Sequence, residues 1–248
     1  MDGREDELAQ RLIAGAKAFS DLLTDEEMQV WYRFSCRALT ARSDLWKALY
    51  DFKGEGIKSI IKGENIRLRL KKVLTQVQLN RCCYCKRSLQ NISHAKPLEH
   101  VLSRTDFPQF SVLYQNLVLA CYDCNSKKGG ANWTTLKSDL KFYPYNKASF
   151  EFFHPHFHDF DDHIRYFRFE TNNITISAYI GISNIGKKLC SDLLDSVSRM
   201  EFLVENNPRL AEVSATLKDF GEGLESEEIP TFHDAYKVLE GAIMGSGR

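Results

Sequence analysis

Apolar side chains recur every three or four residues through most of the first 79 positions, which predicts a helical N-terminal region. Thr24 and Glu27 have the spacing of a capping box, so a second helix should begin there. Two further helices are expected over about 44–52 and 65–79, with a glycine-containing break between them. The apolar positions of the first two helices are Leu8, Leu12, Ala16, Phe19, Leu23, Met28, Trp31 and Phe34.

A different pattern begins at residue 80, where the helical spacing of apolar residues stops and turn-forming residues become frequent. Beyond it, Arg165 to Tyr179 alternate like a β-hairpin with a turn at 171–173. Helical spacing then returns, and the expected helices are 185–205, 209–220 and 232–244. The pattern predicts an α+β protein in which a compact core separates an N-terminal helical region from a C-terminal region of hairpin and helices. The expected regions are 1–79, 80–131 and 132–248.

The composition is that of a soluble globular protein, with 43% hydrophobic and 27% charged residues. No apolar run is long enough for a transmembrane helix, and no signal-peptide core follows the charged first residues, so a cytoplasmic protein without membrane contact is expected. Equal numbers of basic and acidic residues, 33 each, exclude a chain that is basic throughout. Residues 53–128 nevertheless contain 14 Lys/Arg and 5 Asp/Glu. This basic middle could face a phosphate backbone or form a solvated helix face.

Two cysteine pairs have the spacing of zinc ligands. They are Cys82-x-x-Cys85 and Cys121-x-x-Cys124. Each Cys-x-x-Cys turn can point two thiolates at one ion, and two such turns complete a closed tetrahedral Zn²⁺ site. Cys83 could replace Cys82 in this site. The other cysteines, Cys36 and Cys190, lie in helical patterns and are expected to be small core residues.

The segment between and after the pairs contains Glu99-His100, then Asn116-Leu117, and finally Asn125 directly after Cys124. In this order and spacing, residues 82–130 resemble the HNH endonuclease family, whose catalytic unit is the ββα-metal motif. Many members have Asp where this chain has Glu99, and a Pro is frequent where it has Leu102-Ser103. The resemblance implies nucleic-acid cleavage.

Hydrolysis of a phosphodiester needs an activated water and a group that absorbs charge at the phosphate. A neutral histidine can deprotonate water, and Mg²⁺ or Mn²⁺ prefers oxygen ligands such as a carboxylate or an amide carbonyl. The resemblance implies that His100 is the general base, that Glu99 and Asn125 hold the catalytic metal, and that Asn116 pins the loop between two strands. The zinc site would then staple a motif too small to stabilise itself.

Basic residues on two helices are candidates for contact with nucleic acid. Lys127 and Lys128 fall in the first turn of the helix expected after the second cysteine pair, where phosphate can also meet the helix dipole. The remaining candidates belong to the helix expected at 65–79, and are Arg67, Arg69, Lys71 and Lys72.

A second cluster of potential ligands runs from His154 to His163. It could be a metal site, but its spacing is more typical of a capped turn that enters a strand. Here the chain more weakly resembles the nuclease subunit of Septu-type and retron-associated antiphage defence systems. That resemblance implies that His154, His158 and His163 are scaffold residues.

Three functions are therefore compatible with the sequence. The first is a metal-dependent endonuclease that cuts nucleic acid, with double-stranded DNA as the expected substrate and the choice between DNA and RNA left open. The second is a zinc-dependent module that binds nucleic acid without cutting it. The third is an effector subunit that is active only beside a partner such as an ATPase. The sequence leaves the oligomeric state and the choice between nicking and double-strand cutting open.

Overall fold

The computed structural model describes residues 3–57, 60–90, 96–130, 134–170 and 175–198. The chain divides into two compact units, 1–160 and 161–248, which are described separately. The divisions expected after residues 79 and 131 both fall inside the first unit.

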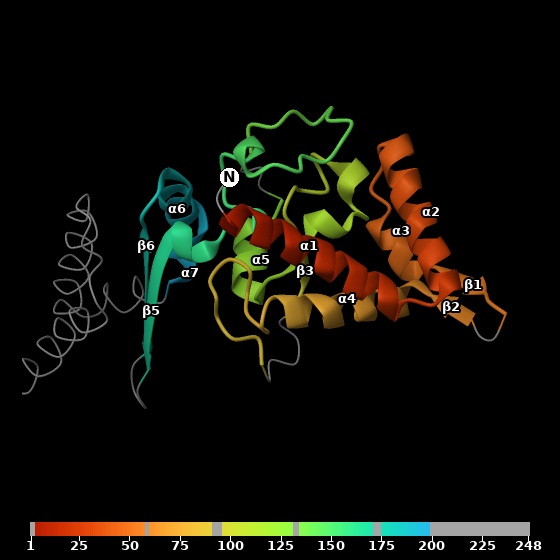
Figure 1. Ribbon diagram of the computed structural model, residues 1–248, viewed down its shortest axis with the longest axis horizontal. Coiled ribbons are helices and arrows are strands. Elements are labelled where there is room, and N and C mark those ends of the chain that lie inside the picture. Colours follow the sequence, from red (N-terminus) through yellow and green to blue (C-terminus); the bar gives the residue numbers. More distant parts are fainter. Residues whose placement is uncertain (1–2, 58–59, 91–95, 131–133, 171–174, 199–248) are drawn as a thin grey trace, which may run out of the picture. The chain divides into compact units, whose positions relative to one another are not determined.

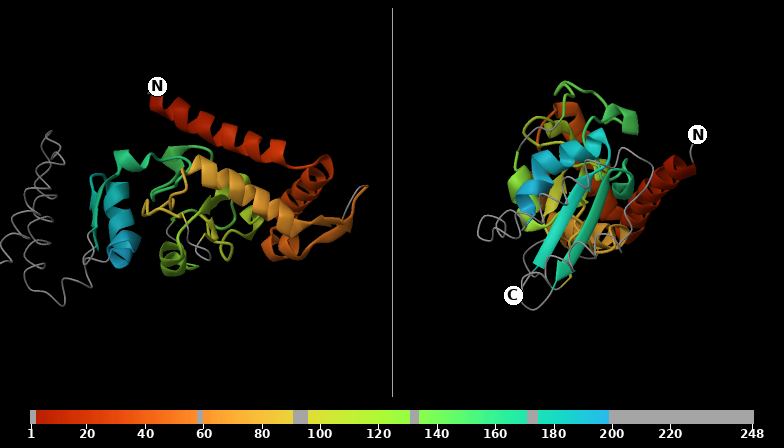
Figure 2. Two further views of the ribbon diagram at one scale, coloured as in Figure 1. Left: turned by 90° about the horizontal axis from the view of Figure 1, so that it is seen from below. Right: turned by 90° about the vertical axis from the view of Figure 1, so that its left-hand side faces the viewer.

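The first unit begins with four helices (Figure 1). They are α1 (Gly3–Leu22), α2 (Asp25–Ala41), α3 (Trp46–Asp51) and α4 (Gly63–Val77). The predicted capping box is confirmed, because the Glu27 amide donates to Thr24 Oγ1 at 3.2 Å and the Thr24 amide donates to Glu27 Oε2 at 2.9 Å. α1 runs alongside α4 and packs against it (Figure 2).

A short antiparallel pair, β1 (Lys53–Glu55) and β2 (Ile60–Lys62), occupies the stretch where the sequence indicated only a break. Three residues per strand are too few for an alternating pattern to be recognised. The pair returns the chain to α3, and the Gly63 amide donates to Phe52 O at 3.0 Å. A Cβ on Gly63 would lie 1.6 Å from Leu49 O, so only glycine lets α4 begin this close to α3.

Apolar side chains of α3 and α4 form the core beneath this junction. Leu49 of α3 and Ile66, Leu70 and Leu74 of α4 are all fully buried. This packing fixes the start of α3, which becomes important for the site described below.

The centre of the first unit is a strand–strand–helix motif. β3 (Leu98–His100) pairs antiparallel with β4 (Leu117–Leu119), with His100 opposite Leu117. α5 (Tyr122–Lys128) follows β4 directly, and Cys121 caps it by accepting a hydrogen bond from the Cys124 amide. Helices with small antiparallel sheets confirm the predicted α+β class.

The second unit contains the predicted hairpin, β5 (Ile164–Glu170) and β6 (Thr175–Gly181). α6 (Asn184–Leu189) follows, and one π-helical turn over Cys190–Leu194 leads into α7 (Asp195–Val197). The helices expected over 209–220 and 232–244, and the end of 185–205, lie outside the described residues. No helix within the described part of the chain is long and apolar enough to cross a membrane.

Gly63→Ala should lower the free energy of unfolding by at least the ~1–3 kcal/mol typical of overpacking, because the new methyl meets the backbone of α3. The matched control is Gly130→Ala, whose Cβ has Thr105 Oγ1 at 3.9 Å as its nearest neighbour. Urea unfolding compares the two variants. Equal midpoints for both would contradict the close approach of α3 and α4.

Candidate active site and metal centre

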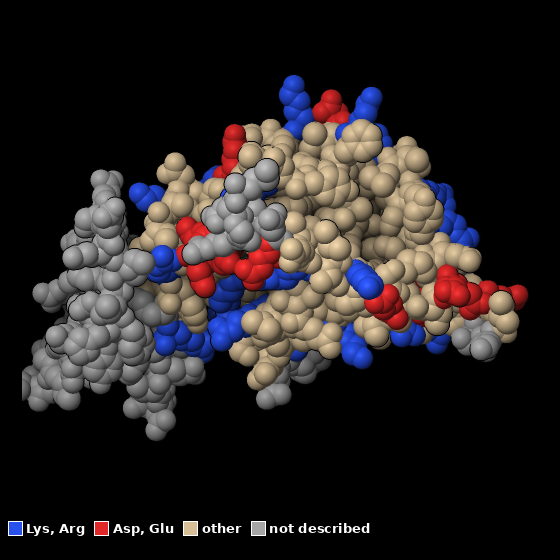
Figure 3. All heavy atoms as spheres, in the orientation of Figure 1, with Lys and Arg blue, Asp and Glu red and all other residues tan. Residues whose placement is uncertain are grey.

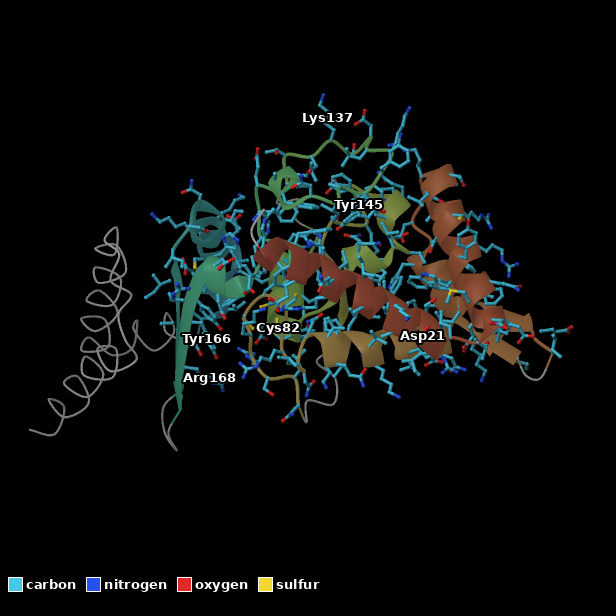
Figure 4. The ribbon with its side chains drawn as sticks, viewed as in Figure 1. Asp21, Cys82, Lys137, Tyr145, Tyr166 and Arg168 are labelled. Atoms are coloured by element: carbon cyan, nitrogen blue, oxygen red, sulfur yellow. The ribbon has the colours of Figure 1, made fainter. Side chains whose placement is uncertain are left out.

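Four cysteine side chains converge in the first unit. Cys82, Cys85, Cys121 and Cys124 are all buried, and their Sγ atoms lie within 4.8 Å of one another. Figure 4 shows Cys82 close to α5, the helix that carries Cys124. The two predicted pairs therefore meet at one point, as a single ion requires.

Backbone hydrogen bonds shape the first cysteine turn. The Cys82 amide donates to Arg87 O at 2.9 Å, and the Lys86 amide donates to Cys82 O at 3.1 Å. Lys86 adopts a left-handed conformation with φ of 56°, which closes the turn. An ion pair between Arg87 and Asp123 of α5 joins the two cysteine turns at their outer edge.

The electrostatics of the four sulfurs favour a bound cation. Hydrogen bonds shared with Cys121 raise the pKa values of Cys85 and Cys124, because they favour the protonated thiols, and a hydrogen bond with Cys124 lowers the pKa of Cys121. A divalent ion at the centre would hold all four sulfurs as thiolates. The donor set and its closed burial suit Zn²⁺.

Cys83 does not belong to this cluster. Its amide donates to Leu119 O at 3.0 Å and its side chain is buried, so the residue ties the first cysteine turn to β4. The geometry thus selects Cys82 over Cys83 as the fourth ligand.

His100 lies at the end of β3 and is buried, with 7% of its surface exposed. Its Nε2 is 2.9 Å from Ser111 O. A carbonyl oxygen only accepts, so this bond assigns the proton to Nε2 and leaves the lone pair on Nδ1. Burial lowers the pKa of His100 to about 3, and Arg104, Lys128 and Arg67 favour the neutral form further. The imidazole is therefore neutral at physiological pH.

Glu99 points away from His100, as alternation along a strand requires. Its Oε1 lies 2.5 Å from Nζ of Lys128, and both side chains are buried. The same ammonium donates to His100 O at 2.9 Å. Burial raises the pKa of Glu99, and Lys128 opposes that shift. The structure differs here from the sequence-based expectation, because Lys128 is 2% exposed and stabilises a carboxylate rather than facing solvent.

Asn125 lies one turn before Lys128 on the same face of α5, at a spacing of three residues. It is half-buried. Lys127 is exposed.

Asn116 is fully buried between the strands. Its Oδ1 accepts from the Leu102 amide at 2.7 Å, and its Nδ2 donates to Leu102 O and to Phe110 O, both at 3.1 Å. These bonds span the loop that contains Ser111, the partner of His100. This is the geometry that the expected pinning role of Asn116 requires.

The histidine cluster is bonded into the fold. Nδ1 of His154 accepts from the His156 amide at 3.2 Å, so Nε2 carries the proton and donates to Tyr143 Oη at 2.6 Å. Tyr143 Oη is in turn 3.3 Å from Asn116 Oδ1, and His156 Nε2 is 2.9 Å from Leu117 O. His154 and His158 are joined through the His154 amide. This arrangement suits a scaffold, and among the described residues the four cysteines are the only converging group of three or more His, Cys, Asp or Glu ligands.

The basic residues of α4 do not share one face. Arg69 is partly exposed but pairs with the buried Glu27 of α2, with Nε 3.1 Å from Oε2. Lys72 is exposed, whereas Lys71 is half-buried. Arg67 turns toward α3, where its guanidinium lies over the rings of Trp46 and Tyr50. α4 therefore does not present the uniformly basic side that the sequence predicted. Some of its basic side chains contact neighbouring helices, and others are exposed.

The start of α3 supports His100, and sequence reasoning missed it. Trp46 meets the imidazole edge to face, with ring centroids 4.9 Å apart. The Leu45 amide donates to Ser111 Oγ at 3.1 Å, and Asp44 accepts from Arg104 at 2.9 Å. These partners are about 60 residues apart in the chain, so no local spacing could have shown them.

Figure 3 shows one face of the molecule, on which basic and acidic side chains lie beside one another around a broad uncharged area.

Comparison with known proteins gives one informative similarity. The chain is 35% identical over 60 residues to the Septu protein PtuB of Bacillus thuringiensis. The match covers 24% of this chain and 23% of that protein, so the chain spans about a quarter of the relative's length. No family model matches the chain. No solved structure matches it either.

We expect purified protein to carry about one tightly bound Zn²⁺ per chain. Cys85→Ser and Cys124→Ser should lose the metal and unfold at lower temperature. Cys83→Ala should retain it, because Cys83 is equally buried but lies outside the cluster. Elemental analysis and thermal melts provide the measurement. A metal-free parent whose two serine variants melt normally would disprove the metal centre.

Acidification should destabilise the protein below about pH 6.5. Burial lowers the pKa values of His154, His156 and His100, so the unfolded state takes up protons near 6.5 while the folded state does not. Each histidine should therefore cost up to ~1.4 kcal/mol of stability per pH unit as the pH falls from 6.5 toward the lowered values.

Urea unfolding between pH 7.5 and 5.5, with saturating zinc, measures this dependence. His156→Gln should flatten the slope, because a glutamine amide can still donate to Leu117 O but does not titrate. A free energy of unfolding that stays constant over this range would show that the histidines are not buried in their neutral form.

Proposed function

We propose that this protein is a metal-dependent endonuclease that hydrolyses phosphodiester bonds of double-stranded DNA and serves in antiphage defence. The observation that carries the proposal is the contact between His100 Nε2 and Ser111 O at 2.9 Å, because it assigns the proton of a neutral imidazole to Nε2 and leaves Nδ1 to accept another. The strand–strand–helix motif around it, closed by four cysteines, supports the same conclusion.

In the proposed reaction, His100 Nδ1 takes a proton from the attacking water. Ser111 O and the perpendicular ring of Trp46 orient the imidazole, so the lone pair keeps one direction. Glu99 and Asn125 would hold Mg²⁺ or Mn²⁺, which when bound would stabilise charge on the phosphate and the leaving oxygen. Lys128 balances the buried carboxylate of Glu99. Asn116 keeps the loop of Ser111 at a fixed distance from β3.

The four-cysteine centre has a separate role in this proposal. Zinc would clamp the turn that precedes β3 to the start of α5. Because α5 carries Asn125 and Lys128, the clamp would fix both residues relative to Glu99 and His100. The metal at the cysteines would therefore be structural, and closed to substrate.

The proposed role in antiphage defence rests on the similarity to the Septu protein PtuB. We propose that the chain acts as the nuclease component of such a system, beside a partner ATPase subunit. The short length of the matched region makes both the partner and the substrate proposals rather than properties taken from the relative.

One observation favours a second function, a zinc-dependent module that binds nucleic acid without cutting it. Burial lowers the pKa of His100 to about 3, and Glu99 is already paired with Lys128. Both would suit structural residues. Nicking of supercoiled plasmid with added Mg²⁺ or Mn²⁺ separates the two functions, because a binding module would leave the plasmid intact.

His100→Ala should reduce cleavage by about 10²–10⁴-fold, the usual contribution of a general base. Zinc content and DNA affinity should stay at the parental level, because His100 is not a cysteine-site ligand. Plasmid cleavage by the repurified variant provides the measurement. A variant that cuts at the parental rate in Mg²⁺, after contaminating nucleases have been excluded, would sink the assignment of His100.

A further inference from the structure

Arg67 lies beside the candidate site, where its guanidinium contacts two aromatic rings. Its guanidinium carbon lies 4.2 Å from the centre of the Tyr50 ring and 5.0 Å from that of Trp46. Its Nε is buried without a hydrogen-bond partner, and no carboxylate forms an ion pair with it among the described residues. Burial lowers the pKa of this guanidinium. The fold therefore keeps a half-buried cation that Glu64 and Asp51 influence electrostatically without forming an ion pair with it.

The position of Arg67 relates it to His100 through Trp46. Trp46 touches the guanidinium of Arg67 and also meets the imidazole of His100, with ring centroids 4.9 Å apart. Asp44 accepts from the Trp46 amide at 2.9 Å and from the guanidinium of Arg104 at 2.9 Å. Arg104 is thereby fixed next to the same tryptophan. Two arginines consequently flank the aromatic support of the candidate base.

Stacking on aromatic rings engages the face of a guanidinium and leaves its N–H edge free. That edge matches the oxygens of a phosphate, which it can bind through two parallel hydrogen bonds. A cation that forms no ion pair favours an anionic ligand more strongly than one already paired. Lys71 lies one turn further along α4 and continues the row of positive charge.

We infer that Arg67 and Arg104 together receive a phosphate of the DNA backbone beside His100, and that Lys71 leads the strand along α4. This inference rests on the proposed function for its choice of DNA. It assigns Arg104 a supporting role, because this guanidinium pairs with Asp44 but its side chain is 41% exposed and Asp44 itself is partly exposed. It separates Arg67 from Arg69, which lies on the same helix but is neutralised by the buried Glu27.

Arg67→Met tests the inference against a matched control, Arg69→Met. Methionine keeps an apolar stem over the two rings, so loss of the charge is the main change at Arg67. In a His100→Ala background, binding of a short fluorescein-labelled DNA duplex is titrated at several salt concentrations without added Mg²⁺ or Mn²⁺. Urea unfolding is measured for every variant.

Arg67→Met and Arg104→Gln should each weaken binding by about 10- to 100-fold and reduce the slope of log affinity against log salt by about one. Arg67→Lys should keep the salt slope but recover only part of the affinity, because lysine lacks the planar fork. Arg69→Met should show the reverse pattern, with lower stability and parental affinity, because it breaks an ion pair with a buried carboxylate.

Binding by Arg67→Met within twofold of the parent, or an equal loss of affinity in Arg69→Met, would overturn the inference. A parental protein that does not bind the duplex would overturn it as well. Plasmid nicking keeps the two proposals apart. If the parent binds through Arg67 but never nicks, the phosphate site stands and the nuclease fails. If the parent nicks and Arg67→Met nicks and binds equally well, the nuclease stands and the phosphate site fails.

Discussion

A single buried ammonium holds the candidate site together. Lys128 of α5 reaches the carboxylate of Glu99 and the main-chain oxygen of His100, two consecutive residues of β3. A buried charge is tolerated only when it is paired and hydrogen-bonded, so α5 must stay at a fixed distance from β3. The four cysteines impose the same distance from the other end of the helix. The position of α5 relative to Glu99 and His100 depends on that double attachment.

The features that the sequence predicted correctly depend on neighbouring residues. The capping box of Thr24 and Glu27 and the pairing of β5 with β6 are local, and the spacing of the residues is enough to specify them. The cysteine pairs belong to the same class, because two residues between thiols allow few geometries. The meeting of the two pairs across 36 residues followed from chemistry, since each pair supplies half of a ligand set.

The features that the sequence did not predict depend on how helices pack. Arg67, Arg69 and Lys71 are all basic residues of α4, yet their environments differ. Arg67 lies over aromatic rings, Arg69 pairs with Glu27, and Lys71 is half-buried. Their environments are set by α2 and α3, which the pattern of α4 does not contain. Lys128 is a further case, because a lysine after a cysteine pair gives no sign that a buried carboxylate lies across from it.

The hydrogen bonds from His154 through Tyr143 to Asn116 have a consequence for the evolution and engineering of this protein. Asn116 lies within the 80–131 segment, whereas Tyr143 and His154 lie beyond it. The start of α3, which supports the loop of Ser111, lies before it. The segment that carries the motif therefore depends on residues on both sides of it and is not an independent structural unit. A transplant of residues 80–131 into another host would leave the loop beside His100 without its anchors on both flanks.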